Sequence, residues 1–104
     1  MTSQTLYFIE ARAVQPGETY FVERDPNEAC WSSTIHDLMT MQIDHPVRVL
    51  EVIPDEHWSA DATVKVCQAI ADHSASKCEP LHPRLIEWIE SHLGTRVANE
   101  LQAA

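Results

Sequence analysis

A stretch of apolar residues held between two prolines constrains the fold of this 104-residue chain more than any other part of it. Residues 47–53 are rich in Val, Ile and Leu, and a run of this length and composition favours a strand over a helix. The flanking prolines lack backbone N–H groups and therefore end the strand on both sides. Leu50 and Val52 are apolar on the face that also carries Arg48, so we expect this strand to be covered on both faces along its second half.

The N-terminal part of the chain predicts a β-hairpin. Residues 6–14 and 19–24 each alternate in the manner of strands. The Gln-Pro-Gly-Glu sequence between them fits a type II turn, because Pro presets the first central φ and Gly tolerates a positive second φ. The expected core residues of the hairpin are Tyr7, Ile9, Ala11 and Ala13.

Two helices are predicted on either side of the apolar strand. Thr34 and Asp37 form a capping box for a short helix that ends by about residues 42–44. Ser59 is a good N-cap, and the apolar residues after it recur at helical spacing. This pattern predicts a second helix over about residues 60–74.

The end of the chain predicts two further helical segments. Pro83 suits the first residue of a helix, and Gly94 suits the left-handed residue that follows its end. Residues 95–101 are expected to form a last short helix. The order strand, strand, helix, strand, helix, helix predicts one α+β domain of 104 residues, a three-stranded sheet with helices packed on it. Residues 1–5 and 102–104 are expected to fray.

The charge of the chain excludes several kinds of partner. Sixteen acidic residues against seven Lys and Arg give a formal net charge of −9. This excess argues against direct binding of nucleic acid or of an anionic membrane surface, since both attract basic proteins. Three cysteines, an odd number in no disulfide-framework spacing, favour a reducing compartment. Because there is no basic leader and no apolar run of membrane length, we expect a cytoplasmic protein.

The scarcity of glycine excludes several classes of enzyme. The chain has two glycines, Gly17 and Gly94. A Walker loop, a dinucleotide fingerprint and a serine nucleophile elbow each need glycines where the backbone crowds a ligand or turns sharply. None of these motifs can be assembled here. We therefore expect no cofactor and favour a non-enzymatic protein.

Acidic and imidazole residues gather where the apolar strand ends and a helix is predicted to begin. A strand end fixes position and a helix N-terminus offers free N–H groups, so His57 could form an acid–base pair with a neighbouring carboxylate. The alternative interpretation is a solvated acidic loop with Ser59 as the helix cap. The candidate catalytic residues are Asp55, Glu56, His57 and Asp61.

Four thiol and imidazole residues make a candidate zinc site, since zinc prefers such ligands. The group lacks a Cys-x-x-Cys pair, and Cys67 and His73 are six residues apart on a predicted helix, which points them to different faces. The favoured alternative is a buried cysteine, a histidine at the edge of the core and loop residues. The candidate metal ligands are Cys67, His73, Cys78 and His82.

Apolar residues outside the predicted core indicate a protein partner. Leu6 and Phe8 occupy the strand face not assigned to the core, and a small sheet has exposed edges that invite pairing. The leading hypothesis is a non-enzymatic interaction or regulatory domain that forms a homodimer. Two alternatives stay open: a small enzyme or ligand-binding domain that uses His57 and Asp61, and an acidic decoy that mimics nucleic acid. The candidate partner-binding residues are Leu6, Phe8, Trp31, Trp58 and Trp88.

Several local sequences together resemble a group of small proteobacterial proteins of unknown function. They are the hairpin, the Ser-Thr-Ile-x-Asp-Leu start of the first helix, the Pro-Val-Arg-Val-Leu-Glu-Val strand and the Trp-Ser-x-Asp sequence at 58–61. The resemblance covers roughly residues 6–70 and implies a shared fold and a bacterial origin. It implies no chemistry, so no functional residue is carried over from it.

Overall fold

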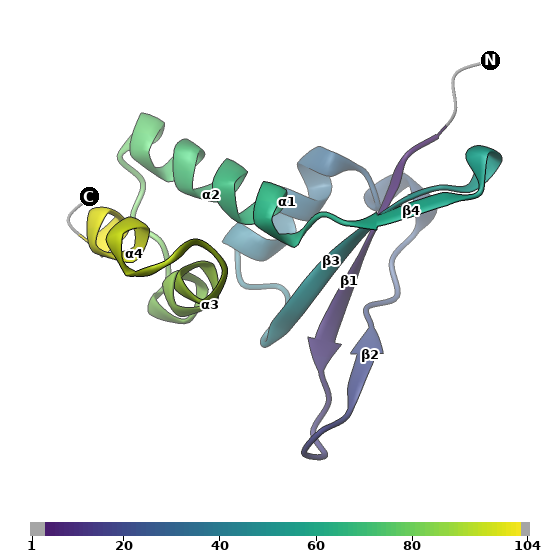
Figure 1. The fold of residues 1–104 in the computed structure, drawn as a ribbon, viewed down its shortest axis with the longest axis horizontal. Coiled ribbons are helices and arrows are strands. Elements are labelled where there is room, and N and C mark those ends of the chain that lie inside the picture. Colours follow the sequence, from purple (N-terminus) through teal and green to yellow (C-terminus); the bar gives the residue numbers. More distant parts are fainter. Residues whose placement is uncertain (1–3, 103–104) are drawn as a thin grey trace.

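The computed structural model describes residues 4–102, except for the side chains of residues 98–100 and 102. Figure 1 shows the strands on one side of the molecule and the helices gathered on the other, which confirms the α+β class. In chain order, the elements are β1 (Leu6–Arg12), β2 (Thr19–Phe21), η1 (Pro26–Glu28), α1 (Trp31–Met39), β3 (Pro46–Ile53), η2 (Pro54–Glu56), β4 (Trp58–Asp61), α2 (Thr63–Lys77), α3 (Pro83–Leu93) and α4 (Thr95–Gln102).

The four strands form one antiparallel sheet in the order β2-β1-β3-β4. β1 and β2 make the predicted hairpin, and Gly17 in its turn has a φ of 81°, as a type II turn requires. β3 matches the predicted apolar strand and pairs with β1 from Leu6, opposite Val52, to Ala11, opposite Pro46. The two strands that the sequence predicts most clearly are therefore the centre of the sheet.

The predicted three-stranded sheet is wrong, because β4 adds a fourth strand along the second half of β3. The sequence assigned this segment to the start of a helix. The chain reverses at His57, whose φ of 50° lies in the left-handed region. Tight hairpins usually place Gly, Asn or Asp in that conformation, and none of these residues occupies the position here. The usual sequence signal for a hairpin was therefore missing.

Two helices begin at residues other than those predicted. α1 begins at Trp31, before the predicted Thr34 cap, because the chain is tied to the sheet until just before the helix: the Tyr7 N–H donates to Ala29 O at 2.7 Å. α2 begins at Thr63, since β4 occupies the residues assigned to its first turn. By contrast, α3 begins at Pro83 as predicted.

One face of the sheet, which we call the covered face, packs against the helices. Tyr7, Ile9 and Ala11 are buried there, as predicted for the hairpin, and Val49 of β3 is buried beside them. The prediction of Ala13 as a core residue is wrong, because Ala13 lies beyond the end of β1 and is only half-buried. α3 also lies beside the first half of β3, where the Trp88 indole N–H donates to Val47 O at 3.2 Å. The most buried helical side chains in this core are Leu38, Val66, Cys67, Ile70, Leu85 and Ile89.

The segment between β2 and α1 is held in place by Arg24, whose side chain is only 6% exposed. Its Nη1 donates to Thr34 Oγ1 at 3.1 Å and to Glu28 O at 3.2 Å, and lies 3.5 Å from the Asp37 carboxylate. Its Nη2 donates to Tyr7 O. One buried guanidinium thus joins β1, η1 and α1.

Candidate functional site

The second face of the sheet, which we call the open face, has no buried residue among those that the structure describes. Leu6 lies opposite Val52 and Phe8 lies opposite Leu50, so these four half-buried side chains form one apolar block. Phe21 of β2 adjoins the block and is 48% exposed. The expectation that β3 is covered on both faces is wrong, because the helices pack on the covered face.

Polar side chains surround this apolar block. Glu10 accepts a hydrogen bond from the Thr19 hydroxyl at 2.6 Å and pairs with the Arg48 guanidinium, and these two hydrogen bonds lower the pKa of Glu10. Asp61 lies opposite Leu50. Its carboxylate accepts from the Thr63 N–H at 2.8 Å, and hydrogen bonding to Thr63 lowers its pKa. An apolar centre with a polar rim is the usual anatomy of a protein–protein interface.

The open face carries little of the charge of the chain. Two carboxylates, Glu10 and Asp61, and two arginines, Arg12 and Arg48, hold register positions on this face. Their formal charges cancel, whereas the whole chain carries −9. The acidic excess therefore lies mainly on other surfaces. A nearly neutral face can approach a second acidic molecule with less repulsion than the rest of the surface can.

The five candidate partner-binding residues do not form one surface. Leu6 and Phe8 share the open face. Trp58 pairs with Ile53 at the far end of β4, on the other side of the sheet, and is 43% exposed. Trp31 packs edge-on against Tyr7 from α1, and Trp88 is buried in α3. Leu6 and Phe8 are thus the two of the five that the structure brings together.

The candidate catalytic residues are spread over the two ends of β4. Asp55 and Glu56 are exposed in η2 and precede the exposed His57 at the turn. Asp61 is the last residue of β4, whereas His57 precedes the first. The four residues of this strand span about 13 Å, which separates Asp61 from the turn. The structure thus collects Asp55, Glu56 and His57 in one exposed turn and holds Asp61 apart from them.

The four candidate metal ligands have separate surroundings. Cys67 is buried in α2, and this burial raises its pKa to about 12. His73 Nε2 lies 3.3 Å from the Glu79 carboxylate, Cys78 is exposed at the end of α2, and His82 Nδ1 caps the start of α3. Among the residues described, no group of three or more His, Cys, Asp or Glu side chains is arranged to hold a metal ion.

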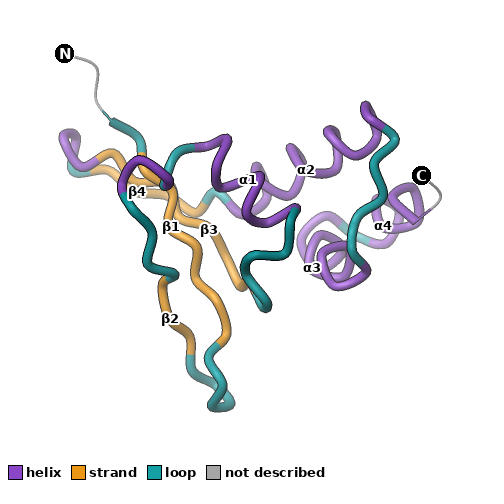
Figure 2. Tube along the Cα trace, turned by 180° about the vertical axis from the view of Figure 1, so that it is seen from behind, coloured by secondary structure: helices purple, strands orange, loops and turns teal. Residues whose placement is uncertain are grey.

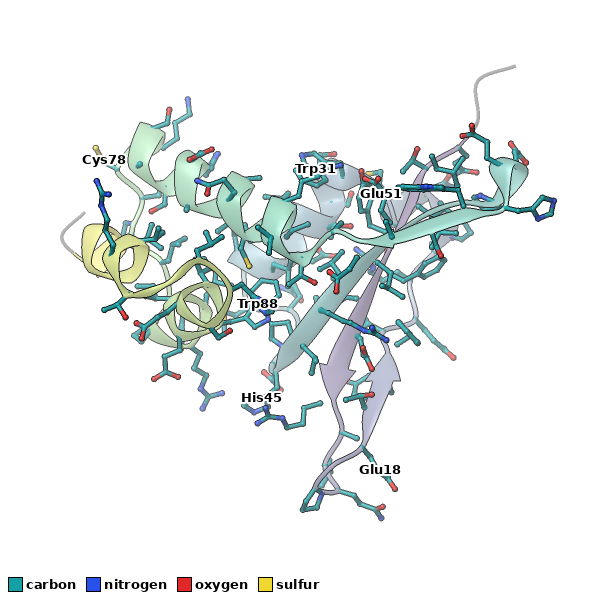
Figure 3. The ribbon with its side chains drawn as sticks, in the orientation of Figure 1. Glu18, Trp31, His45, Glu51, Cys78 and Trp88 are labelled. Atoms are coloured by element: carbon teal, nitrogen blue, oxygen red, sulfur yellow. The ribbon has the colours of Figure 1, made fainter. Side chains whose placement is uncertain are left out.

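A polar cluster at the end of the covered face was missed by sequence reasoning. The Tyr7 hydroxyl donates to Glu51 Oε1 at 2.7 Å, and the Lys65 ammonium donates to the same oxygen at 2.6 Å. Lys65 also lies 5.2 Å from the centre of the Trp31 ring, and Figure 3 shows Trp31 and Glu51 on neighbouring parts of the molecule. Burial and then Glu51 raise the pKa of Tyr7 to about 12, whereas Lys65 and then Tyr7 lower the pKa of Glu51.

The Cys30 thiol was also missed. Cys30 is the N-cap residue of α1 and is half-buried. Its thiol donates to Ser33 Oγ at 3.3 Å and lies 3.6 Å from Ser32 Oγ, and hydrogen bonding to these serines lowers its pKa to about 7. A thiol of such pKa is more reactive than an ordinary cysteine. The Ser-Ser sequence that follows Trp31 is the only signal in the sequence that could have indicated it.

Comparison of the chain with protein-family models, with curated proteins and with solved structures gave no match. The resemblance to the proteobacterial group therefore stays a prediction. Within the described part of the chain, no helix is both long enough and apolar enough to cross a membrane.

Proposed function

We propose that this protein is a non-enzymatic interaction domain that self-associates through the open face. The observation that carries the proposal is the block of Leu6, Phe8, Leu50 and Val52, with Phe21 beside it, on a sheet face that the helices leave uncovered. Contiguous apolar surface with a polar rim marks an interaction site in soluble proteins.

A second copy of the chain is the partner that fits this face best. Two such faces can stack as the sheets of a β-sandwich do, with side chains interdigitating between sheets about 10 Å apart. Such a contact is isologous, so Arg48 of one copy can approach a carboxylate of the other. The balanced charge of the face supports a like partner, because a basic partner would be drawn to the more acidic surfaces instead.

Sedimentation velocity over a range of protein concentrations tests the proposal. We expect the average mass of the wild-type protein to rise from monomer to dimer with concentration. Leu50→Arg places a charge at the centre of the open face and should keep the protein monomeric. Val64→Arg is the matched control, because Val64 is an exposed apolar residue on α2, outside the open face, and this variant should associate like the wild type.

Phe21→Arg serves as a second variant, since Phe21 is half exposed and its replacement leaves the core intact. We expect this variant to weaken association while its circular dichroism spectrum and urea midpoint stay near those of the wild type. A wild-type protein that remains monomeric up to millimolar concentration would contradict the proposal. So would folded Leu50→Arg and Phe21→Arg variants that associate as well as the wild type.

A further inference from the structure

A second surface lies among the helices. A hollow of about 650 Å³ opens between α1, the second half of α2 and the segment that joins α2 to α3. Figure 2 shows α1 and α2 from the side on which α1 lies in front. We call this hollow the α1 groove. Its apolar lining residues are Trp31, Ile35, Met39, Ala69, Pro80 and Leu81.

The α1 groove is lined by an apolar stripe of α1 that packs against the edge of the core and is not fully covered by it. Thr34 and Leu38 of this helix are buried in the core. Trp31, Ile35 and Met39 follow one another at four-residue spacing beside these buried residues and are only half-buried. Apolar residues at this spacing form the contact stripe of a helix that packs against another helix. The small residue Ala69 of α2 lines the same hollow.

The dimensions of the stripe suit a helical ligand. From Trp31 to Met39 the stripe runs about 12 Å along the axis of α1, at a rise of about 1.5 Å per residue. That length matches about two turns of a docked helix, which would insert side chains at i, i+4 and i+7. An open groove with one apolar floor is also closer to a peptide-binding site than to an enclosed small-molecule pocket.

Apart from His36 and His73, the titratable side chains that line the α1 groove are acidic. A second hollow of about 610 Å³ shares Ser32 and His36 with the first, and Glu28 and Asp37 line it. Glu79 lines the first hollow, and among the described lining residues neither hollow has a Lys or Arg. The Arg24 guanidinium lies 3.5 Å from Asp37, and His73 Nε2 lies 3.3 Å from the Glu79 carboxylate. Glu28 is exposed, and Glu79 is 56% exposed and has a second carboxylate oxygen, so these two glutamates are the acids that a ligand can pair with.

We propose that the α1 groove binds a basic amphipathic helix of a partner protein. Apolar side chains of that helix lie on the Trp31, Ile35 and Met39 stripe, and its Lys or Arg residues pair with Glu28 and Glu79. The occupant is not a second copy, because a chain with a net charge of −9 brings further carboxylates to an acidic rim. The α1 groove is separate from the open face. An experiment can therefore contradict helix binding without contradicting self-association, and the reverse also holds.

Isothermal titration calorimetry with a synthetic peptide tests this inference. The probe is a Leu/Lys peptide with Leu at helical spacing, and its control is a scrambled peptide of the same composition without an apolar stripe. We expect the amphipathic peptide to bind the wild-type protein and the Leu50→Arg variant equally. The Glu28→Gln/Glu79→Gln variant should bind about five-fold more weakly, since each exposed ion pair contributes modestly.

Matched variants separate the α1 groove from the general acidity of the protein. Glu23→Gln/Glu90→Gln removes the same charge at exposed positions outside both hollows and should leave peptide affinity unchanged. Met39→Arg should abolish binding, whereas Val64→Arg should not. Equal binding of the scrambled peptide, equal effects of the two double variants, or unchanged binding to Met39→Arg would each overturn the inference. It would also be overturned if Met39→Arg abolished self-association, because a second copy would then occupy the groove.

Discussion

The two faces of the sheet carry apolar residues of similar kinds, but helices pack against only one of the faces. Phe8 and Ile9 are neighbours on β1, and both are large and apolar, yet Ile9 is 0% exposed on the covered face while Phe8 is only half-buried on the open face. The difference comes from the helices, whose apolar residues pack on one face. Apolar alternation therefore identifies a strand here without identifying the face on which the core forms.

The polar groups on the two faces differ in the same way. On the covered face, Tyr7 is buried and shares one oxygen of Glu51 with Lys65. On the open face, Glu10 pairs with Arg48, whose side chain is 46% exposed. Water and salt screen an exposed pair, whereas a buried hydrogen bond that is broken leaves an unsatisfied group. The covered face should thus determine monomer stability, and the open face should determine association.

The largest expected effect is the loss of a core side chain. Ile9→Ala should lower the free energy of unfolding by about 3–4 kcal/mol, because it leaves a cavity in the covered face. Phe8→Ala, at the neighbouring position, should cost about 1–2 kcal/mol when the protein is dilute and monomeric, because Phe8 is only partly buried. Urea unfolding of both variants at low protein concentration measures the difference. Equal losses of unfolding free energy in the two variants would show that the two faces are equally buried in the monomer. Such a result would contradict the distinction between the covered face and the open face.

The next largest expected effect on stability distinguishes Arg24 from Arg48. Arg24→Met should lower the free energy of unfolding by about 2–3 kcal/mol, because Tyr7 O and the Thr34 hydroxyl lose a buried charged donor. Arg48→Met removes an exposed pair and should cost well under about 1 kcal/mol. Thermal and urea unfolding of both variants provide the test. A cost for Arg48→Met that matched the cost for Arg24→Met would mean that the pair on the open face is structural.

A smaller effect should depend on pH. The pKa of Tyr7 is raised from 10.0 to about 12 in the folded protein, so its contribution to stability is complete below pH 10 and is lost as the pH rises through about 12. Tyr7→Phe should cost about 1 kcal/mol at neutral pH. The difference between wild type and variant should shrink from pH 10 upwards in urea unfolding measured along a pH series. A difference that stayed constant across this range would exclude the Tyr7–Glu51 hydrogen bond as its source.

The sequence predicted the parts of the fold that local patterns determine. Pro-Gly at a turn with positive φ, alternation along β1, the apolar run of β3 and Pro83 at a helix start all have local causes, and all are confirmed. β4 was missed because His57 adopts a left-handed conformation without the residues that usually mark one. His57 follows the short helical turn η2 in the connection between β3 and β4, and its N–H donates to Pro54 O at 3.1 Å.

Only part of the candidate site could be predicted. Alternation placed Leu6 and Phe8 off the core face, which the register confirms. The uncovered state of Leu50 and Val52 could not be derived, because it depends on where the helices pack. The contribution of Phe21 depends on the pairing of β2 with β1. Contacts between residues far apart in the chain therefore assemble the open face, as they do the cluster of Tyr7, Glu51 and Lys65.

Fluorine NMR tests the role of the open face most directly. The chain contains two phenylalanines, and both, Phe8 and Phe21, lie on the open face. Protein labelled with fluorophenylalanine therefore carries probes on that surface alone, and fluorotryptophan at the buried Trp88 gives an internal control. We expect both phenylalanine resonances to shift as the concentration rises from micromolar to millimolar, while the Trp88 resonance stays in place. Phenylalanine resonances that do not change while the protein dimerises would show that another surface mediates association.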